Sequence, residues 1–499
     1  MTLISQEAIR EFQINTNDYD VTSGRFAGGA IQATTKSGTN DIEGSVFFYN
    51  RNDDLQSNFN VRGTERVDDF TTNQYGFSVG GPIVKDKVHF YAVYERQDQD
   101  LTRNIGNIRD GAAGDDDQNA LRINRDSLNE FLSIARELYG VSDAPMTGLF
   151  DRKTEANTFF ARIDWQINDK HRLTIRNNFN KWESPLNTSD NSNLEIRESW
   201  SDFNSQENST LISLRSTLSS NLTNEVKVQY QRAEREFIPS GGFIPERNIP
   251  RAVVFIRSTT PDGRSSNRSV QLGGQRFTPE TNLENQIHFT NTTYLSKGKY
   301  NFTFGTDNQI TFLETLLSSE QNGRFTFQSL DDFRNLNPNR YLREAPISGQ
   351  PPVVEQTVLD LSLFAQVDFN IRPDLRLLAG LRYDATAFLD DAEYNPLVDE
   401  EIGVRTDVKP QDWNNIQPRV QLTWNYKNKN TDIIKIGGGV FNAQPHYYAQ
   451  VNNIQNSGRL IQSVDVSGDL VPTPDFPAYR ESASAVPGVE INEANGIYL

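Results

Sequence analysis

The chain has 499 residues, with 49 lysines and arginines against 66 aspartates and glutamates, so its formal net charge is −17. Charge of this sign repels phosphates and counts against nucleic-acid binding, and 30 Phe, 17 Tyr and 5 Trp are too many aromatics for a disordered chain. The absence of cysteine excludes disulfides, thiolate nucleophiles and cysteine-ligated metal sites. No run approaches the roughly 18 apolar residues of a membrane-spanning helix, but a membrane β-barrel hides its hydrophobicity by alternation.

Short motifs, several of them containing glycine, occupy the first forty residues. They are Glu11–Thr16, Gly24-Arg25, Gly28-Gly29 and Lys36–Asn40. Paired glycines allow positive φ angles or close approach of two backbones, which predicts tight packing of this segment against another element. Ordinary hairpin glycines are the alternative for each pair taken alone.

From residue 45 onward, apolar and polar residues alternate with the period of a β-strand. In Phe159–Ile167, for example, Phe159, Ile163 and Trp165 alternate with Arg162 and Asp164. The pattern predicts about thirteen strands of roughly ten residues, the length of a tilted membrane-crossing strand. They are Ser45–Tyr49, Gln74–Pro82, Val88–Glu95, Phe159–Ile167, Leu173–Phe179, Leu211–Leu218, Val226–Tyr230, Ile287–Leu295, Tyr300–Phe304, Leu359–Phe369, Leu375–Tyr383, Val420–Tyr426 and Ile433–Phe441.

Short and long connections alternate between these strands. The short ones are polar turns such as Asn168-Asp169-Lys170 and Arg372-Pro373-Asp374. The long ones cover about 20 to 55 residues each, and compact soluble domains rarely have so many. They are Arg51–Thr72, Leu101–Thr154, Trp182–Gln206, Glu236–Asn282, Glu314–Val353 and Phe388–Asn415. Outer-membrane barrels have short periplasmic turns and long external loops, so the asymmetry favours that architecture.

One segment in the second long connection breaks the β pattern. Ser127–Gly140 has apolar residues at helical spacing and ends in glycine, which predicts a short helix. We expect this helix to pack within its loop; a catalytic or partner-binding role is the alternative. After the last strand, Val464–Asn492 is rich in Pro, Ser and Asp and predicts another external loop.

The motifs up to residue 95 resemble those of TonB-dependent outer-membrane receptors. The matching residues in the last strands of that family's plug domain are Gly24, Arg25, Gly28, Gly29, Lys36, Gly38 and Asn40. Gly44–Asn52 is similar to the family's first barrel strand, and Gly76–Ile83 with Lys85-Asp86-Lys87 is similar to its second strand and turn. The pattern is most similar to the Oar-like subset, whose members carry a carboxypeptidase-regulatory-like domain before the plug.

The resemblance implies an all-β fold. Residues 1–40 are expected to be the C-terminal end of a plug, and residues 41–499 the N-terminal part of an antiparallel transmembrane β-barrel. Plugged barrels of this kind have about 22 strands, so about 13 make a partial barrel. Because the N-terminal residues lack the basic and apolar regions of a signal peptide, we expect a fragment that lacks both ends of the protein.

Aromatic residues near strand ends suggest contact with the bilayer interface. They are Trp165, Phe179, Trp182, Tyr230, Tyr300, Tyr383, Trp424 and Tyr426. Amphipathic rings favour that interface, whereas the core of a soluble β-sandwich is the alternative. The opposite face of the strands would then line a polar lumen or contact a plug, through Arg162, Arg176, Gln229, Gln366 and Arg382.

By resemblance, the whole protein binds a substrate and imports or passes it across the outer membrane of a Gram-negative bacterium, using inner-membrane energy. Its expected partners are outer-membrane lipid, a TonB-type energy-transducing complex that acts through a segment outside this chain, and an unidentified oligosaccharide, peptide, siderophore or protein substrate. We expect no cofactor and no enzyme activity, since nucleophile-elbow, Walker, zincin and Rossmann motifs are absent.

Several other hypotheses stay open. A surface adhesin or glycan-binding protein would act through the same long loops, a secreted hydrolase needs a convergent carboxylate pair, and a passive porin would lack the plug motif. Asp115–Asp117, Asp390-Asp391 and Asp399–Glu401 offer oxygen ligands for Ca²⁺, with solvated loop charge as the alternative. Arg334, Arg340 and Arg343 in one loop are candidates for meeting an anionic substrate.

Overall fold

The structure, a computed structural model, describes the chain apart from several short segments. The described residues are 4–15, 18–25, 30–56, 59–61, 64–66, 69–106, 108–109, 121–141, 145–188, 193–240, 249–273, 275–317, 319–348, 351–426 and 432–494.

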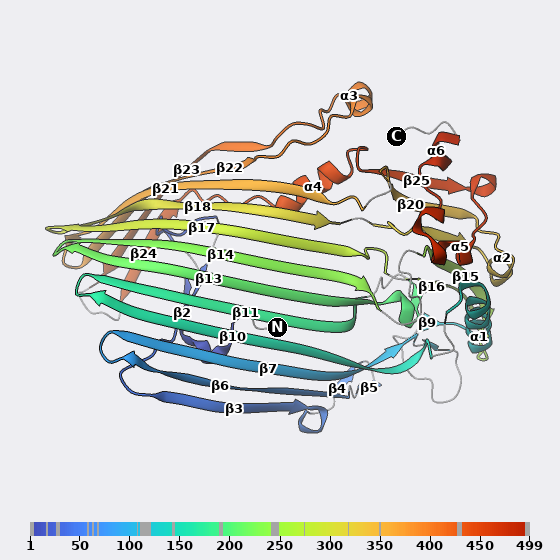
Figure 1. Cartoon of the computed structure of the whole chain (residues 1–499), viewed down its shortest axis with the longest axis horizontal. Coiled ribbons are helices and arrows are strands. Elements are labelled where there is room, and N and C mark those ends of the chain that lie inside the picture. Colours follow the sequence, from blue (N-terminus) through green and yellow to red (C-terminus); the bar gives the residue numbers. More distant parts are fainter. Residues whose placement is uncertain are drawn as a thin grey trace.

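Thirteen strands form one antiparallel sheet in which neighbours in space follow one another along the chain (Figure 1). Each overlaps one of the thirteen predicted strands, so the predicted number of strands is confirmed. The strands are β3 (Glu43–Asn52), β6 (Phe70–Val84), β7 (Val88–Ile105), β10 (Gly148–Asn168), β11 (His171–Thr188), β13 (Ser201–Ser219), β14 (Leu222–Pro239), β17 (Glu280–Lys297), β18 (Tyr300–Leu316), β21 (Val354–Arg372), β22 (Leu375–Phe388), β23 (Gln411–Asn425) and β24 (Ile433–Gly439).

Most of these strands are longer than predicted. β10 has 21 residues and β21 has 19, against the roughly ten that cross a bilayer. The additional residues extend into the predicted long connections, because hydrogen-bonded pairing continues beyond the alternating segment. Within the described part of the chain, β3 and β24 have one neighbour each, so the sheet is open.

The two faces of the sheet have reversed polarity compared with a soluble sandwich. We call the face that residues 4–40 contact the inner face. Arg382 and Gln417 on this face are 0% exposed, whereas Val46 and Leu363 on the outer face are 88% and 61% exposed. Apolar residues outside and polar residues inside are typical of a barrel in lipid, which argues against the sandwich alternative. Among the helices that the structure describes, none is long and apolar enough to cross a membrane.

Several long connections are joined to one another, because strands from four regions pair in a second, six-stranded sheet at the end of the molecule away from the short turns (Figure 1). Its order is β12-β16-β15-β19-β20-β25. These strands are β12 (Leu194–Glu195), β15 (Arg251–Thr259), β16 (Ser265–Leu272), β19 (Arg324–Phe327), β20 (Arg340–Pro346) and β25 (Ile461–Ser467). With helices α1 (Arg125–Ile134), α2 (Leu330–Arg334) and α5 (Phe476–Glu481) they form what we call the outer cap.

The outer cap has its own apolar core. Phe131, Val254, Phe325 and Val464, from four different connections, are each 0% exposed in one continuous cluster. The predicted helix is confirmed as α1 with a π-helical turn over Ala135–Tyr139. It ends at Gly140, whose φ of +70° favours glycine. The tail predicted as a loop, Val464–Asn492, instead supplies most of β25, α5 and most of α6 (Glu490–Ala494), because its apolar residues join this core.

Smaller elements complete the described structure. Near the N-terminus, the 3₁₀ turn Gln6–Ala8 leads into β1 (Ile9–Asn15), which pairs antiparallel with β2 (Ala30–Thr35) on the inner side of the sheet. The others are β4 (Phe59–Val61), β5 (Thr64–Arg66), β8 (Ile108–Arg109), β9 (Leu121–Arg122), α3 (Pro396–Ile402) and α4 (Tyr447–Gln455).

Candidate functional site: the contact between residues 18–25 and the sheet

Residues 18–25, which we call the 18–25 loop, lie on the inner face of the sheet between β1 and β2 in sequence. The loop is folded by its own carboxylates, since Asp20 accepts the backbone N–H of Thr22 (2.8 Å) and Asp18 accepts the hydroxyl of Ser23 (2.8 Å). Short acidic side chains commonly form such turns. The loop therefore presents a fixed backbone to the sheet.

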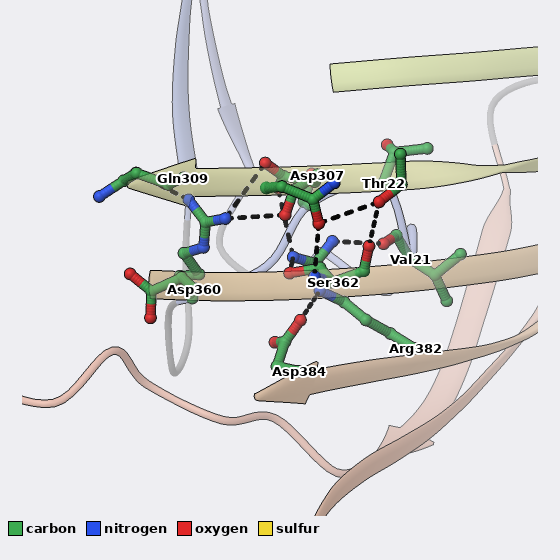
Figure 2. Close-up of polar contacts among 12 residues, drawn as sticks. Val21, Thr22, Asp307, Gln309, Asp360, Ser362, Arg382 and Asp384 are labelled. Atoms are coloured by element: carbon green, nitrogen blue, oxygen red, sulfur yellow. Dashed lines mark hydrogen bonds and ion pairs between the residues drawn. The ribbon is translucent and has the colours of Figure 1, made fainter. Parts of the chain in front are cut away.

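Arg382 on β22 is the centre of this contact (Figure 2). Its side chain is fully buried and donates to the carboxylates of Asp384 (2.7 Å) and Asp307 (3.2 Å) and to the hydroxyl of Ser362 (2.8 Å). A further N–H donates to the backbone carbonyl of Val21 in the loop (3.1 Å). The guanidinium therefore joins β18, β21 and β22 to the 18–25 loop.

Arg25 makes the reciprocal contact from the loop to the sheet. Its guanidinium donates to the side-chain oxygen of Gln309 (2.8 Å) and to the backbone carbonyl of Asp307 (2.8 Å). A Cβ on the preceding Gly24 would lie 2.1–2.3 Å from the guanidinium of Arg382. Glycine is therefore required at position 24 because the loop backbone and the buried arginine touch.

Two further residues on the inner face of the sheet bind the loop. Arg419 on β23 donates to the backbone carbonyls of Asp20 (2.9 Å) and Ser23 (2.6 Å). Gln366 on β21 accepts the N–H of Val21 (3.1 Å). The contact also has an apolar part, since Val21 is fully buried and the ring of Tyr19 lies 5.7 Å from that of Phe441. Water can replace the hydrogen bonds and ion pairs when the loop separates from the sheet.

A second contact joins the N-terminal strands to β7 and β10. Arg162 donates to the backbone carbonyl of Thr35 (3.0 Å), and the hydroxyl of Tyr91 donates to the carbonyl of Glu7 (2.8 Å). Ala8 packs in a small apolar cluster with Tyr91 and Phe160. Of the five side chains predicted to face inward, Arg162, Gln366 and Arg382 contact this N-terminal segment; Arg176 and Gln229 line a cavity beside it.

The remaining motif residues connect the N-terminal segment to the sheet. A Cβ on Gly38 would lie 2.1 Å from the carbonyl oxygen of Phe90, so the backbones pack directly. The side chain of Asn40 accepts the N–H of Asp86 in the first short turn (2.8 Å), and Lys36 pairs with Glu7 (3.2 Å). Gly28 and Gly29 lie outside the described residues.

Seven of the eight aromatic residues in the predicted interface group share the outer face by strand alternation. They are Trp165, Phe179, Tyr230, Tyr300, Tyr383, Trp424 and Tyr426. Trp182 instead alternates with Arg176 and Asn180 on the inner face, and its ring packs on Phe203 at 4.9 Å. Because Trp182 and Phe179 are separated by an odd number of positions along β11, their side chains lie on opposite faces. The aromatic pattern alone did not reveal this difference.

The acidic loop residues do not assemble a metal site within the described chain. Asp391 pairs with Lys409 (2.8 Å), and no group of three His, Asp or Glu side chains converges among the described residues. Asp115–Asp117 lie outside those residues.

The three loop arginines are engaged in the outer cap. Arg334 pairs with Glu130 (2.5 Å) and Arg343 donates to the carbonyl of Val486 (2.7 Å). Arg340 pairs with Asp465 (2.6 Å), and its guanidinium lowers the pKa of that carboxyl. These contacts join elements of the outer cap, and the role of the three arginines toward an anionic substrate stays a prediction.

Comparison with known proteins agrees with this architecture. The family model described as outer membrane beta barrel domain matches residues 34–108 and 143–496. The TonB-dependent transporter Oar of Myxococcus xanthus is 32% identical over 97 residues, which cover 18% of this chain and 9% of that protein. The probable TonB-dependent siderophore receptor PirA of Acinetobacter baumannii is 31% identical over 93 residues, covering 18% and 11%.

Among solved structures, the outer membrane transporter YddB of Escherichia coli superposes with a TM-score of 0.58 at 13% identity, over 92% of this chain and 50% of that one. At this identity the likeness shows the fold. The chain therefore spans half the length of that structure and a smaller share of the curated relatives, which are transporters and receptors rather than enzymes. Because the family model covers the large sheet and, apart from α1, the outer cap, the chain belongs to the outer-membrane β-barrel domain family and resides in the outer membrane of a Gram-negative bacterium.

Proposed function

We propose that the chain is part of a TonB-dependent receptor, of the Oar-like kind, that imports or passes a substrate across the outer membrane using inner-membrane energy. In this proposal residues 1–40 are the C-terminal end of a plug and residues 41–499 are the barrel with its external loops. The family model begins at residue 34, close to that boundary. The partners are outer-membrane lipid, a TonB-type complex that acts elsewhere on the whole protein, and a substrate such as a siderophore, oligosaccharide, peptide or protein.

The polar contact of the 18–25 loop with the sheet carries this proposal. A permanent structural element is normally held by apolar burial, whereas this loop is held chiefly by Arg25, Arg382 and Arg419 with their carboxylate and carbonyl partners. The charged and polar groups of this contact rehydrate when they separate, which offsets part of the cost of pulling the loop away. Such a contact suits a plug segment that leaves its place and returns.

A surface adhesin acting through the outer cap is the alternative function. An adhesin would use the cap and would have no need for a loop that separates from the inner face. The two functions therefore differ in whether the 18–25 loop moves when the inner membrane is energised.

Val21→Cys in the complete protein tests this difference. Val21 is a 0% exposed residue of the loop, and this chain has no cysteine to give background labelling. We expect a membrane-impermeant maleimide to label the introduced thiol in energised cells supplied with substrate, and a protonophore to suppress the labelling. Val404→Cys, at a position 52% exposed in an external loop, is the control and should label equally with and without energy.

If the Val21→Cys protein labels equally with and without energy, while the Val404→Cys protein labels normally, a mobile plug segment is excluded and the adhesin is favoured.

A further inference from the structure

A cavity of about 650 Å³ lies between β2 and the inner face of five strands, β10, β11, β13, β14 and β17. Thr34 and Thr35 of β2 form one side of it. The opposite side carries four full cations and one histidine but a single acid, Glu225, in a chain whose net charge is −17. The basic lining residues are Arg162, Arg176, Arg215, Lys227 and His288.

Three of these basic residues already have acidic partners. Arg162 pairs with Asp164 (2.7 Å), Lys227 pairs with Glu225 (2.9 Å), and His288 contacts Asp307. Arg176 and Arg215 have neither an ion pair nor a side-chain hydrogen bond to any residue that the structure describes. The cavity therefore holds two guanidinium groups that form no ion pair with any described residue.

The strand register places Arg176 directly opposite Arg162 on β10, and it places Arg215 between Arg172 on β11 and Glu225 on β14. Like charges at directly opposite positions of a sheet repel and destabilise it. Arg162 and Arg172 share the carboxylate of Asp164 (2.7 and 3.0 Å), so an anion in the cavity would mainly attract Arg176 and Arg215.

We propose that this cavity binds an oxyanion group, a carboxylate or a phosphate, of the ligand that passes through the barrel, with Arg176 and Arg215 as its main ligands. This inference rests on the proposed transport function and names the chemistry of its substrate. The planar guanidinium donates two parallel hydrogen bonds, which match the geometry of carboxylate and phosphate oxygens. The cavity is therefore a second basic surface, beside the arginines of the outer cap, that is available to an anionic substrate.

The position of the cavity places this site next to the 18–25 loop. One row of opposite register positions crosses the neighbouring strands β10, β11, β13, β14, β17 and β18. Outside β13 its residues are Arg162, Arg176, Gln229, His288 and Gln309. Gln309 is the side chain that accepts a hydrogen bond from Arg25. β2 forms a side of the cavity, so displacement of residues 18–40 would open it toward the lumen. The cavity is open to solvent before this movement, so small anions can reach it, and movement of the proposed plug segment would widen it toward the lumen.

The test is calorimetric titration of the complete, detergent-solubilised protein with inorganic phosphate and, separately, with citrate, at low salt. We expect at least one anion to bind, with an affinity that falls as sodium chloride is added. The double variant R176Q/R215Q should bind at least tenfold more weakly. R405Q, which removes an exposed arginine paired with Asp407 in an external loop, is the matched control and should bind like the unmodified protein.

Preferential binding of phosphate or of citrate would support the site and identify which chemistry it takes. Failure of both anions to bind the folded protein, or equal affinity in the R176Q/R215Q variant, would overturn the inference. Labelling of the Val21→Cys protein separates this outcome from the proposed function: energy-dependent labelling without anion binding removes the site alone, whereas labelling that ignores energy removes the transport proposal itself.

Discussion

Gly24 is the residue at which the 18–25 loop comes closest to the sheet. A methyl group there would overlap the guanidinium of Arg382, which is held by two aspartates and cannot move without breaking buried ion pairs. Removing a partner from such a pair costs about 3–5 kcal/mol, and each 1.4 kcal/mol or so changes a population tenfold.

We therefore expect Gly24→Ala to displace the loop. When this change is added to the Val21→Cys protein, the introduced thiol should label at least tenfold faster in de-energised membranes. Gly438→Ala is the control, because a Cβ at that strand position meets no atom within 4 Å. Unchanged labelling of the protein that carries Gly24→Ala would show that the loop is not held at this contact.

Individual residues of the site were only partly predictable. The Gly24-Arg25 motif and the inward positions of Arg382 and Gln366 follow from resemblance and alternation, since each depends on nearby sequence. Their partners Asp307, Gln309 and Arg419 were not predicted, because ion pairing across several hundred residues of chain leaves no local pattern. The available signal was a series of polar residues at inner-face positions of otherwise apolar strands, such as Ser362 and Asp384.

At the scale of elements, the outer cap depends on aromatic packing across separate connections. Phe325 on β19 is fully buried against Tyr341 (ring centroids 4.5 Å apart) and near Phe476 and Tyr479. We expect Phe325→Ala to cost about 3–5 kcal/mol and to unfold the cap without unfolding the large sheet. Added protease should then cleave the external connections of intact cells, whereas Phe277→Ala, at a position 41% exposed, should stay resistant.

If both variants resist protease equally, the cap is stabilised by something other than this aromatic core.

The large sheet was predictable and the cap was not, for a physical reason. Strand alternation repeats over ten or more residues within one segment, as in Leu359–Phe369, and so is visible locally. Cap strands such as Arg324–Phe327 are too short to show a period, and each buries its apolar side against segments from other connections. The helix α1 was found because ten residues with a glycine end give a recognisable amphipathic pattern.

For the whole molecule, the outer-face aromatics define where the bilayer should lie. Trp165 is 44% exposed on the outer face, whereas Trp182 packs on Phe203 on the inner face. The chain has five tryptophans, so variants that keep one of them and replace the others by Phe are practicable. In vesicles of brominated lipid, we expect strong quenching of Trp165 fluorescence and weak quenching of Trp182. Equal quenching would contradict the assignment of the two faces.

The shared core of the outer cap restricts how the cell surface can diversify. External loops usually accept insertions and substitutions independently, because each contacts few other residues. Here Phe131, Val254, Phe325 and Val464 come from separate connections but fill one core, so a change in the shape of one alters the fit of the others. Variation under attack by antibodies or phages should therefore concentrate at exposed positions, while these buried residues change only in compensated sets.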